Sequence, residues 1–168
     1  MSAEAKRRAI LNPWKMRLYM LANLPMGLLA GLRVTAFTEE MASVAIRFKY
    51  LNKNPFRSIY FAALSMAAEM ASGTQGMVYA TSGSPVAMLV VGIEGTFTKK
   101  AVGLITFTCP DGSAIAQAVA ETRATGEPRT VACTSIGVDE QGDQVAVFRL
   151  TWSFKARSTE ARPPAQNP

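Results

Sequence analysis

The sequence predicts an α+β fold in which a mainly antiparallel sheet packs against one long, buried helix. Two observations lead to this expectation. Strand-like runs occur in adjacent pairs joined by short loops, which favours antiparallel pairing. Residues 59–71 are apolar nearly all round a helix, as expected of a helix that the rest of the protein encloses. The length of 168 residues suits a single domain with one core.

The N-terminal third predicts one helix followed by two strands. Residues 1–11 are basic and are expected to form a mobile arm. Asn12 and Pro13 suit a helix N-cap and the first helical position, so a helix is predicted from Pro13 to about Asn23, with Pro25 and two glycines ending it. Two strands are expected next, and the second alternates as a half-buried strand does; they cover residues 31–37 and 44–50.

The buried helix is predicted from Ser58 to about Ser72, with Gly73 as its stop. A buried strand, a second strand broken by a glycine, a helix and a hairpin then follow over residues 86–93, 96–109, 113–125, 130–138 and 145–154. One domain is expected to cover residues 12–155. Residues 156–168 carry three prolines and no apolar run, so they are expected to be a disordered tail.

Charge and composition exclude several classes of function. The chain has no histidine, which rules out Ser-His-Asp and Cys-His catalysis and histidine metal sites. The net charge is +6, but the excess lies at the two ends, and residues 18–154 are balanced. A duplex-binding domain usually places its excess charge on a folded face. We therefore expect no nucleic-acid partner and no metal.

Cysteine usage and the N-terminal segment bear on localisation. Cys109 and Cys133 lie in apolar runs and form no CxxC, so free thiols in a reducing cytoplasm are expected. The uncharged stretch 18–32 follows Lys6-Arg7-Arg8 and resembles a secretory signal, but Pro25 interrupts it. It is also too short to span a membrane, so no integral membrane segment is expected. Peripheral membrane association stays open.

Around the predicted buried helix the chain resembles the hotdog superfamily, in which a curved antiparallel sheet wraps a central helix. Its acyl-CoA thioesterases often read N-x5-H-G-G, with an acidic residue nine positions after the histidine. Here Asn54 stands six positions before Tyr60, and Glu69 stands nine after it, while Tyr-Phe-Ala replaces His-Gly-Gly. The likeness to an uncharacterised thioesterase-like branch covers about residues 12–157, with further matches at 99–103, 107–112 and 145–154.

This resemblance implies hydrolysis of an acyl-CoA or acyl-carrier thioester, with a fatty or aromatic acyl group. Glu69 is the candidate base or nucleophile, because burial in an apolar helix raises a carboxyl pKa. The backbone N–H groups of Phe61 and Ala62 would stabilise the oxyanion, and Asn54 would orient the carbonyl or the water. Neighbouring positions are expected to contact substrate, namely Tyr60, Ser65 and Gly73.

Each assignment has a structural alternative. Glu69 could instead form an ion pair or a cap near the helix end, and Asn54 could form the turn before Pro55. Tyr60 and Phe61 could be core residues.

Six basic side chains are candidates for binding the phosphates of coenzyme A, which enters only as part of the substrate and not as a cofactor. They are Arg47, Lys49, Lys53, Arg57, Lys99 and Lys100. The alternative is a solvated strand face that discourages edge pairing.

The fold resemblance further implies a homodimer or a dimer of dimers. The main rival function is a non-catalytic acyl-ligand binder on the same fold, because Phe61 stands where glycine would allow close backbone approach. A hotdog hydratase is disfavoured, since that resemblance requires an Asp/His pair.

Overall fold

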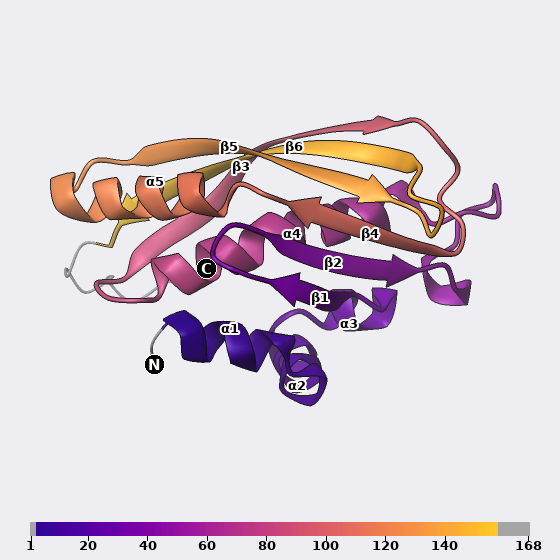
Figure 1. The fold of residues 1–168 in the computed structure, drawn as a ribbon, viewed down its shortest axis with the longest axis horizontal. Helices are drawn as coiled ribbons and strands as arrows, with labels where there is room; N and C mark the ends of the chain where they lie inside the picture. Colours follow the sequence, from indigo (N-terminus) through magenta and orange to yellow (C-terminus); the bar gives the residue numbers. More distant parts are fainter. Residues whose placement is uncertain (1–2, 158–168) are drawn as a thin grey trace, which may run out of the picture.

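The computed structural model describes residues 3–157, which form one sheet with helices on one side of it (Figure 1). The helices and one 3-10 turn are α1 (Ala3–Leu11), α2 (Pro13–Asn23), α3 (Pro25–Ala30), η1 (Tyr50–Asn52), α4 (Phe61–Ala80) and α5 (Gly112–Thr125). The strands are β1 (Arg33–Phe37), β2 (Ala42–Arg47), β3 (Val86–Phe97), β4 (Leu104–Cys109), β5 (Arg129–Val138) and β6 (Gln144–Ala156). No helix in this range is long and apolar enough to cross a membrane.

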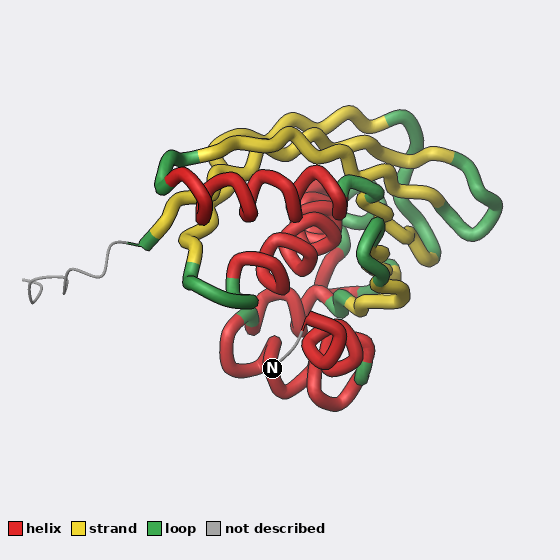
Figure 2. The backbone as a smooth tube through the Cα atoms, turned by 60° about the vertical axis from the view of Figure 1, so that its left-hand side comes forward, coloured by secondary structure: helices red, strands yellow, loops and turns green. Residues whose placement is uncertain are grey.

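The six strands form one antiparallel sheet in the order β1-β2-β4-β5-β6-β3. The sheet curves over α4, and the N-terminal helices lie on the far side of α4 from most of the sheet (Figure 2). A curved antiparallel sheet around a long central helix is the hotdog arrangement that the sequence resemblance implies. The predicted α+β class is confirmed, as is the hairpin of β5 and β6.

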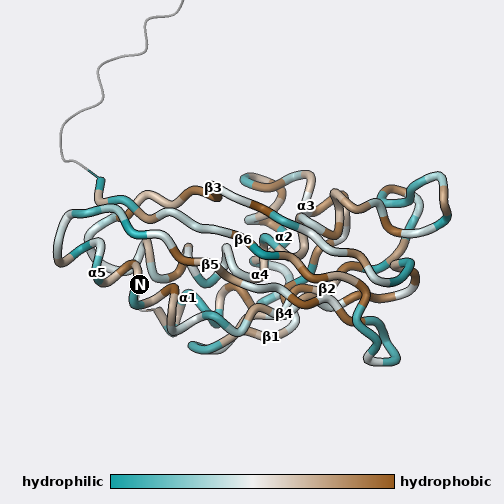
Figure 3. The backbone as a smooth tube through the Cα atoms, turned by 90° about the horizontal axis from the view of Figure 1, so that it is seen from above, coloured by the Kyte–Doolittle hydropathy of each residue, from teal (hydrophilic) through white to brown (hydrophobic). Residues whose placement is uncertain are grey.

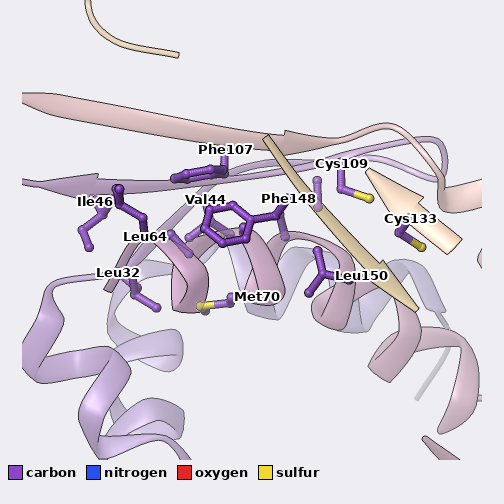
Figure 4. Close-up of a cluster of buried hydrophobic side chains, with 14 of the residues drawn as sticks. Leu32, Val44, Ile46, Leu64, Met70, Phe107, Cys109, Cys133, Phe148 and Leu150 are labelled. Carbon is purple, nitrogen blue, oxygen red and sulfur yellow. The ribbon is translucent and has the colours of Figure 1, made fainter. Parts of the chain in front are cut away.

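The core lies between the concave face of the sheet and α4. Side chains of β2, β4 and β6 gather there against the helix, as Figure 4 shows for Ile46, Phe107, Phe148 and Leu150. The face of α4 that meets them is made of small residues such as Ala67, fully buried. Small side chains let the sheet approach the helix closely, which explains how so apolar a helix is enclosed.

The N-terminal segment is more helical than the sequence predicted. Residues 3–11 form α1 rather than a mobile arm, and Lys6 donates hydrogen bonds to the carbonyl and hydroxyl of Thr81 at 2.8 Å. Asn12 caps α2 as predicted, its side chain accepting the N–H groups of Trp14 and Lys15. Pro25 does not end the helical region. It begins α3, because proline fits the first turn of a helix.

The central helix is longer than predicted. It begins at Phe61 rather than after Ser58 and continues through Gly73 and Gly76 to Ala80. A methyl group at Gly76 would lie 2.8 Å from the Met88 side chain. The glycines lie where side chains of β3 and β6 pack closely against the helix, and the predicted stop at Gly73 is wrong.

Two strand predictions are also wrong in detail. Residues 86–97 form the single strand β3, and most of this strand is exposed rather than buried. The predicted half-buried strand 44–50 is shorter, and β2 is buried on both faces until Arg47. Of the predicted tail, residues 158–168 lie outside the described range, and Ala156 still belongs to β6.

Candidate active site

Glu69 lies in the middle of α4 and lines a cavity of about 290 Å³. Most of the other lining is apolar, including Met70, Met88 and Trp152. Burial raises the pKa of the Glu69 carboxyl. Within residues 3–157 no side chain forms an ion pair or hydrogen bond with this carboxylate. The ion pair or helix-end cap that could have explained Glu69 structurally is therefore absent from this range.

Gly73 keeps the space beside Glu69 open. A methyl group at this position would lie 3.0 Å from Glu69 Oε1 and 3.2 Å from the Trp152 ring. The indole N–H of Trp152 donates to the hydroxyl of the fully buried Ser72 at 2.9 Å, which fixes the ring in the cavity wall. Ser65, one turn before Glu69, is half-buried and does not line this cavity.

The start of α4 presents the two predicted oxyanion donors. The N–H groups of Ala63 and Leu64 both donate to the carbonyl of Tyr60. Those of Phe61 and Ala62 have no acceptor in the described part of the chain. Both groups are therefore available to a ligand at the positive end of the helix dipole.

The aromatic side chains at this helix start are exposed rather than packed in the core. Tyr60 is 46% and Phe61 56% exposed, so the core alternative is wrong for both. Their rings touch edge to face at 4.7 Å, and Phe61 continues to Phe97 at the end of β3. The start of α4 thus joins an exposed aromatic surface beside the strand edge.

Glu69 and these donors are far apart within one chain. Eight residues of α-helix separate Phe61 from Glu69, which corresponds to about 12 Å along the axis. One thioester carbonyl cannot contact both groups of a single copy.

Asn54 organises its own loop. Its Oδ1 accepts the N–H groups of Phe56 and Ser58, and its Nδ2 donates to the Ser58 hydroxyl at 3.0 Å. This is the turn-forming alternative. The residue lines a separate cavity of about 590 Å³, away from Glu69, so its predicted catalytic role stays a prediction without a direct contact to the acid.

The six basic candidates fall into three groups. Arg47 pairs with Glu140, and Lys99 pairs with both Asp139 and Asp143. Lys49 lies elsewhere, beside α2 and β1. The remaining three surround the loop of Asn54, and none forms an ion pair within residues 3–157; they are Lys53, Arg57 and Lys100.

Sequence reasoning missed the residues that complete the Glu69 cavity. Trp152 and Met88 come from β6 and β3, and Tyr19 and Leu24 come from the N-terminal helices. No spacing in the sequence links these positions to Glu69. The alternation of apolar and polar residues along β6 could have placed Trp152 on the face toward α4, but not beside the Glu69 carboxylate.

One cluster in the described range has metal-ligand chemistry. Ligand atoms of Cys109, Asp111 and Cys133 lie within 4.8 Å of one another. A hydrogen bond with Cys109, together with burial, raises the pKa of Cys133. Metals bind the thiolate, so this environment disfavours a metal. Both cysteines are free and buried, as predicted, and Asp111 accepts the N–H of Thr134 at 2.7 Å.

Several solved structures share this fold at low sequence identity. PA5026 of Pseudomonas aeruginosa, a protein of unknown function described as a probable thioesterase, is 21% identical, with a TM-score of 0.71, over 86% of this chain and 97% of that one. PaaI of Escherichia coli, from the phenylacetic acid degradation operon, is 16% identical, with a TM-score of 0.60, over 90% and 96%. The thioesterase HI1161 of Haemophilus influenzae is 14% identical, with a TM-score of 0.61, over 83% and 88%.

No curated protein matches the chain in sequence. A family model matches residues 14–154, which is most of the described structure. The chain therefore belongs to the family described as Domain of unknown function (DUF4442), and it has the hotdog fold of these solved structures.

Proposed function

We propose that this protein hydrolyses an acyl thioester, with coenzyme A as the carrier and a fatty or aromatic acyl group. The observation that carries the proposal is Glu69, a half-buried carboxylate without a protein partner in residues 3–157 that faces an apolar cavity. A carboxylate in such surroundings is poised to take a proton, or to attack a carbonyl, near neutral pH. The thioesterase names of the structural relatives agree with this chemistry.

The reaction needs two copies of the chain. Because Phe61 and Glu69 lie about 12 Å apart on one helix, the acid of one copy must work with the helix start of another. The apolar edge of β3 ends beside this helix start at Phe97, and it supplies a surface for such pairing. We therefore propose a homodimer with its active sites between subunits.

In this site Glu69 removes a proton from water, and the water oxygen attacks the thioester carbon. The negative charge on the carbonyl oxygen is stabilised by the N–H groups of Phe61 and Ala62 of the second copy. The C–S bond then breaks, and the proton held by Glu69 passes to the leaving thiolate. In the covalent variant Glu69 attacks the carbonyl itself, the C–S bond breaks, and the thiolate leaves an anhydride of Glu69 and the acyl group. Water then hydrolyses this anhydride, which restores the Glu69 carboxylate, releases the acid and supplies the proton that converts the thiolate to the thiol.

The phosphates of coenzyme A fit the cations around the Asn54 loop. Lys53, Arg57 and Lys100 come from two segments and carry no acidic partner in the described range. We expect Lys53→Ala/Arg57→Ala to raise KM for acyl-CoA several-fold with little change in kcat. An acyl thioester of a short pantetheine, which lacks the nucleotide phosphates, is the control substrate. The two free thiols suit a reducing compartment, and we place the protein in the cytoplasm.

The test is thiol release from acyl-CoA thioesters of increasing chain length, with three variants. Glu69→Gln should lower kcat/KM by at least about 100-fold. Phe61→Pro removes the donor N–H at a position where proline fits, because Tyr60 has the extended φ of −62° and ψ of 135° that precede proline. Phe61→Ala keeps the N–H and removes the same ring, so it is the matched control.

Mixing the two defective variants tests the shared site. A heterodimer of Glu69→Gln and Phe61→Pro contains one site with both intact groups, so re-equilibrated mixtures should recover about a quarter of wild-type activity. No recovery from variants that still form mixed dimers would contradict a site between subunits. Unchanged turnover in Glu69→Gln would discard Glu69 as the catalytic acid.

A second candidate is an acyl-ligand binder without turnover. Phe61 favours it, since a bulky residue stands where thioesterases of this fold use glycine. Ligand-induced thermal stabilisation with no thiol release from any thioester would support this function instead.

A further inference from the structure

A third cavity lies between the N-terminal helices and β1, on another side of α2 from the Glu69 cavity. Its volume is about 610 Å³, within the range of ligand pockets. Much of its lining is aliphatic and comes from α1, α2, α3 and the start of β1: Ile10, Met16, Met20, Leu28, Leu32 and Val34. The cavity therefore presents aliphatic side chains from several segments of the chain, beside polar and charged ones.

Three cations border the same cavity. Arg17 comes from α2, Arg33 from β1 and Lys49 from the segment after β2, and no acidic residue lines the cavity. None of these three side chains forms an ion pair within residues 3–157. Elsewhere in that range Arg7, Arg47, Lys99 and Arg129 do pair with acids, whereas the three cavity cations remain available to a ligand.

Gly31 leaves room for the Lys49 side chain at the cavity wall. This glycine ends α3 with a φ of +84°, and a methyl group on it would lie 2.7 Å from Lys49 Nζ. The ammonium group thus lies directly over the turn at the cavity wall. The Asn52 side chain links the backbone at Lys49 to the end of α3, because it accepts the N–H of Lys49 and donates to the carbonyl of Ala30.

We infer that this cavity binds an amphiphile with one flexible apolar chain and an anionic head group, the chain lying among the aliphatic side chains and the head group at Arg17, Arg33 and Lys49. A carboxylate or a phosphate ester satisfies this chemistry, because both accept charge-assisted hydrogen bonds from guanidinium and ammonium groups. A neutral chain of equal length would gain no such hydrogen bonds from the three cations.

This site is distinct from the Glu69 site. Glu69 lines the other cavity, where its carboxylate would repel an anionic head group. Met16 is buried between the two cavities and lines both, so they share one side chain of their walls. A fatty carboxylate is also the class of product that the proposed hydrolysis releases, but the inference stands on the cations and does not require turnover.

The experiment is displacement of a fluorescent long-chain fatty acid from the full-length protein. Hexadecanoate, hexadecyl phosphate and hexadecanol are the competitors, since they share one chain and differ only in the head group. Wild type should bind the two anions at least about tenfold more tightly than the alcohol. If hexadecyl phosphate binds more tightly than hexadecanoate, the head group of the ligand is a phosphate ester. If hexadecanoate binds more tightly, the head group is a carboxylate.

Two variants locate the binding. Arg33→Gln/Lys49→Gln should weaken the anions about tenfold and leave the alcohol unchanged. Lys15→Gln/Lys155→Gln removes the same charge from exposed positions outside the cavity and should leave all three affinities unchanged. Glu69→Gln should also bind normally, whether or not it retains hydrolysis.

The inference is overturned by any of three results. Equal affinity for the alcohol and the anions would remove the role of the cations. If Glu69→Gln lost binding and Arg33→Gln/Lys49→Gln kept wild-type affinity, the ligand would lie in the Glu69 cavity. Failure of the probe and both anions to bind wild type would exclude the ligand class. Failure of thiol release alone, with selective anion binding intact, would count only against the proposed hydrolysis.

Discussion

The two edges of the sheet are finished in different ways. At one edge β1 has five residues, helix α1 packs beside it, and Arg7 of α1 pairs with Glu39 just beyond the strand. At the other edge β3 has twelve residues, and within residues 3–157 it pairs only with β6. Its side chains there are apolar and exposed, with Leu89 at 66%, Val91 at 55% and Ile93 at 53%, and Figure 3 shows the hydrophobic stretch.

Long, exposed, apolar edges are rare in monomeric proteins because they pair with other chains. Within residues 3–157 the chain thus covers one edge with its own helix and leaves the other uncovered. The Glu69 cavity and the cavity bordered by the three cations also lie against different edge strands. Met88 of β3 lines the acidic cavity of Glu69, whereas Arg33 and Thr35 of β1 line the basic one. The open edge and the proposed catalytic acid therefore lie on the same side of the molecule.

The largest expected effect comes from charging the open edge. Val91→Lys/Ile93→Lys should convert the proposed dimer to a monomer and lower thiol release by at least about 100-fold, because each site would lose the helix start of the other copy. Light scattering after gel filtration gives the mass. Thr35→Lys places a charge at an exposed position of β1 and should leave mass and activity unchanged. A dimeric, active double variant would contradict pairing through β3.

A smaller effect is expected from Glu69→Gln on stability. Burial raises the pKa of this carboxyl in the folded protein, so its contribution to stability is present at low pH and is lost as pH rises through the folded-state pKa. At neutral pH and above the variant should be more stable than wild type by about 1 kcal/mol. The difference should shrink as pH falls toward the ordinary range of a glutamate. Denaturant titrations across this pH range measure it, and a variant less stable at every pH would reveal a stabilising partner of Glu69.

The smallest effect is expected at the closed edge. Arg7→Ala removes the ion pair with Glu39, in which the arginine side chain is mostly buried and the glutamate mostly exposed. The free energy of unfolding should fall by about 0.5–1 kcal/mol, with no change in mass. Arg8→Ala, which breaks an exposed pair with Glu4 within α1, is the matched control and should cost less. A change of oligomeric state in Arg7→Ala would mean that β1 also contributes to assembly.

Local signals predicted the parts of the fold that local interactions determine. Asn12 and Pro13 predicted the start of α2, and the alternating runs around residues 139–143 predicted the β5–β6 hairpin. Elements decided by distant contacts were missed. Gly73 lies inside α4, packed close to Trp152 of β6, and the sequence does not show this distant contact. An apolar run such as β3 has the same sequence pattern whether or not the chain covers it.

In the candidate site, too, the sequence predicted the local features and missed those that depend on distant contacts. Glu69 was identifiable as the lone charge in an apolar helix, and the free N–H groups of Phe61 and Ala62 follow from the helix start. The wall that makes Glu69 unusual was not. Met88 and Trp152 lie 19 and 83 positions further along the chain, so only the folded sheet brings them to the carboxylate.

The strand order has a consequence for synthesis on the ribosome. β3 is made before β4 and β5, yet its neighbour in the sheet is β6, so Val86 pairs with Ala156 near the end of the domain. After β3 is complete, roughly fifty more residues must be added before β6 begins, which takes about 2–10 s at ordinary elongation rates. Throughout this interval the exposed apolar strand β3 lacks β6, its neighbour in the sheet. The nascent chain is therefore most exposed to aggregation and to chaperones between residues 97 and 144 of its synthesis.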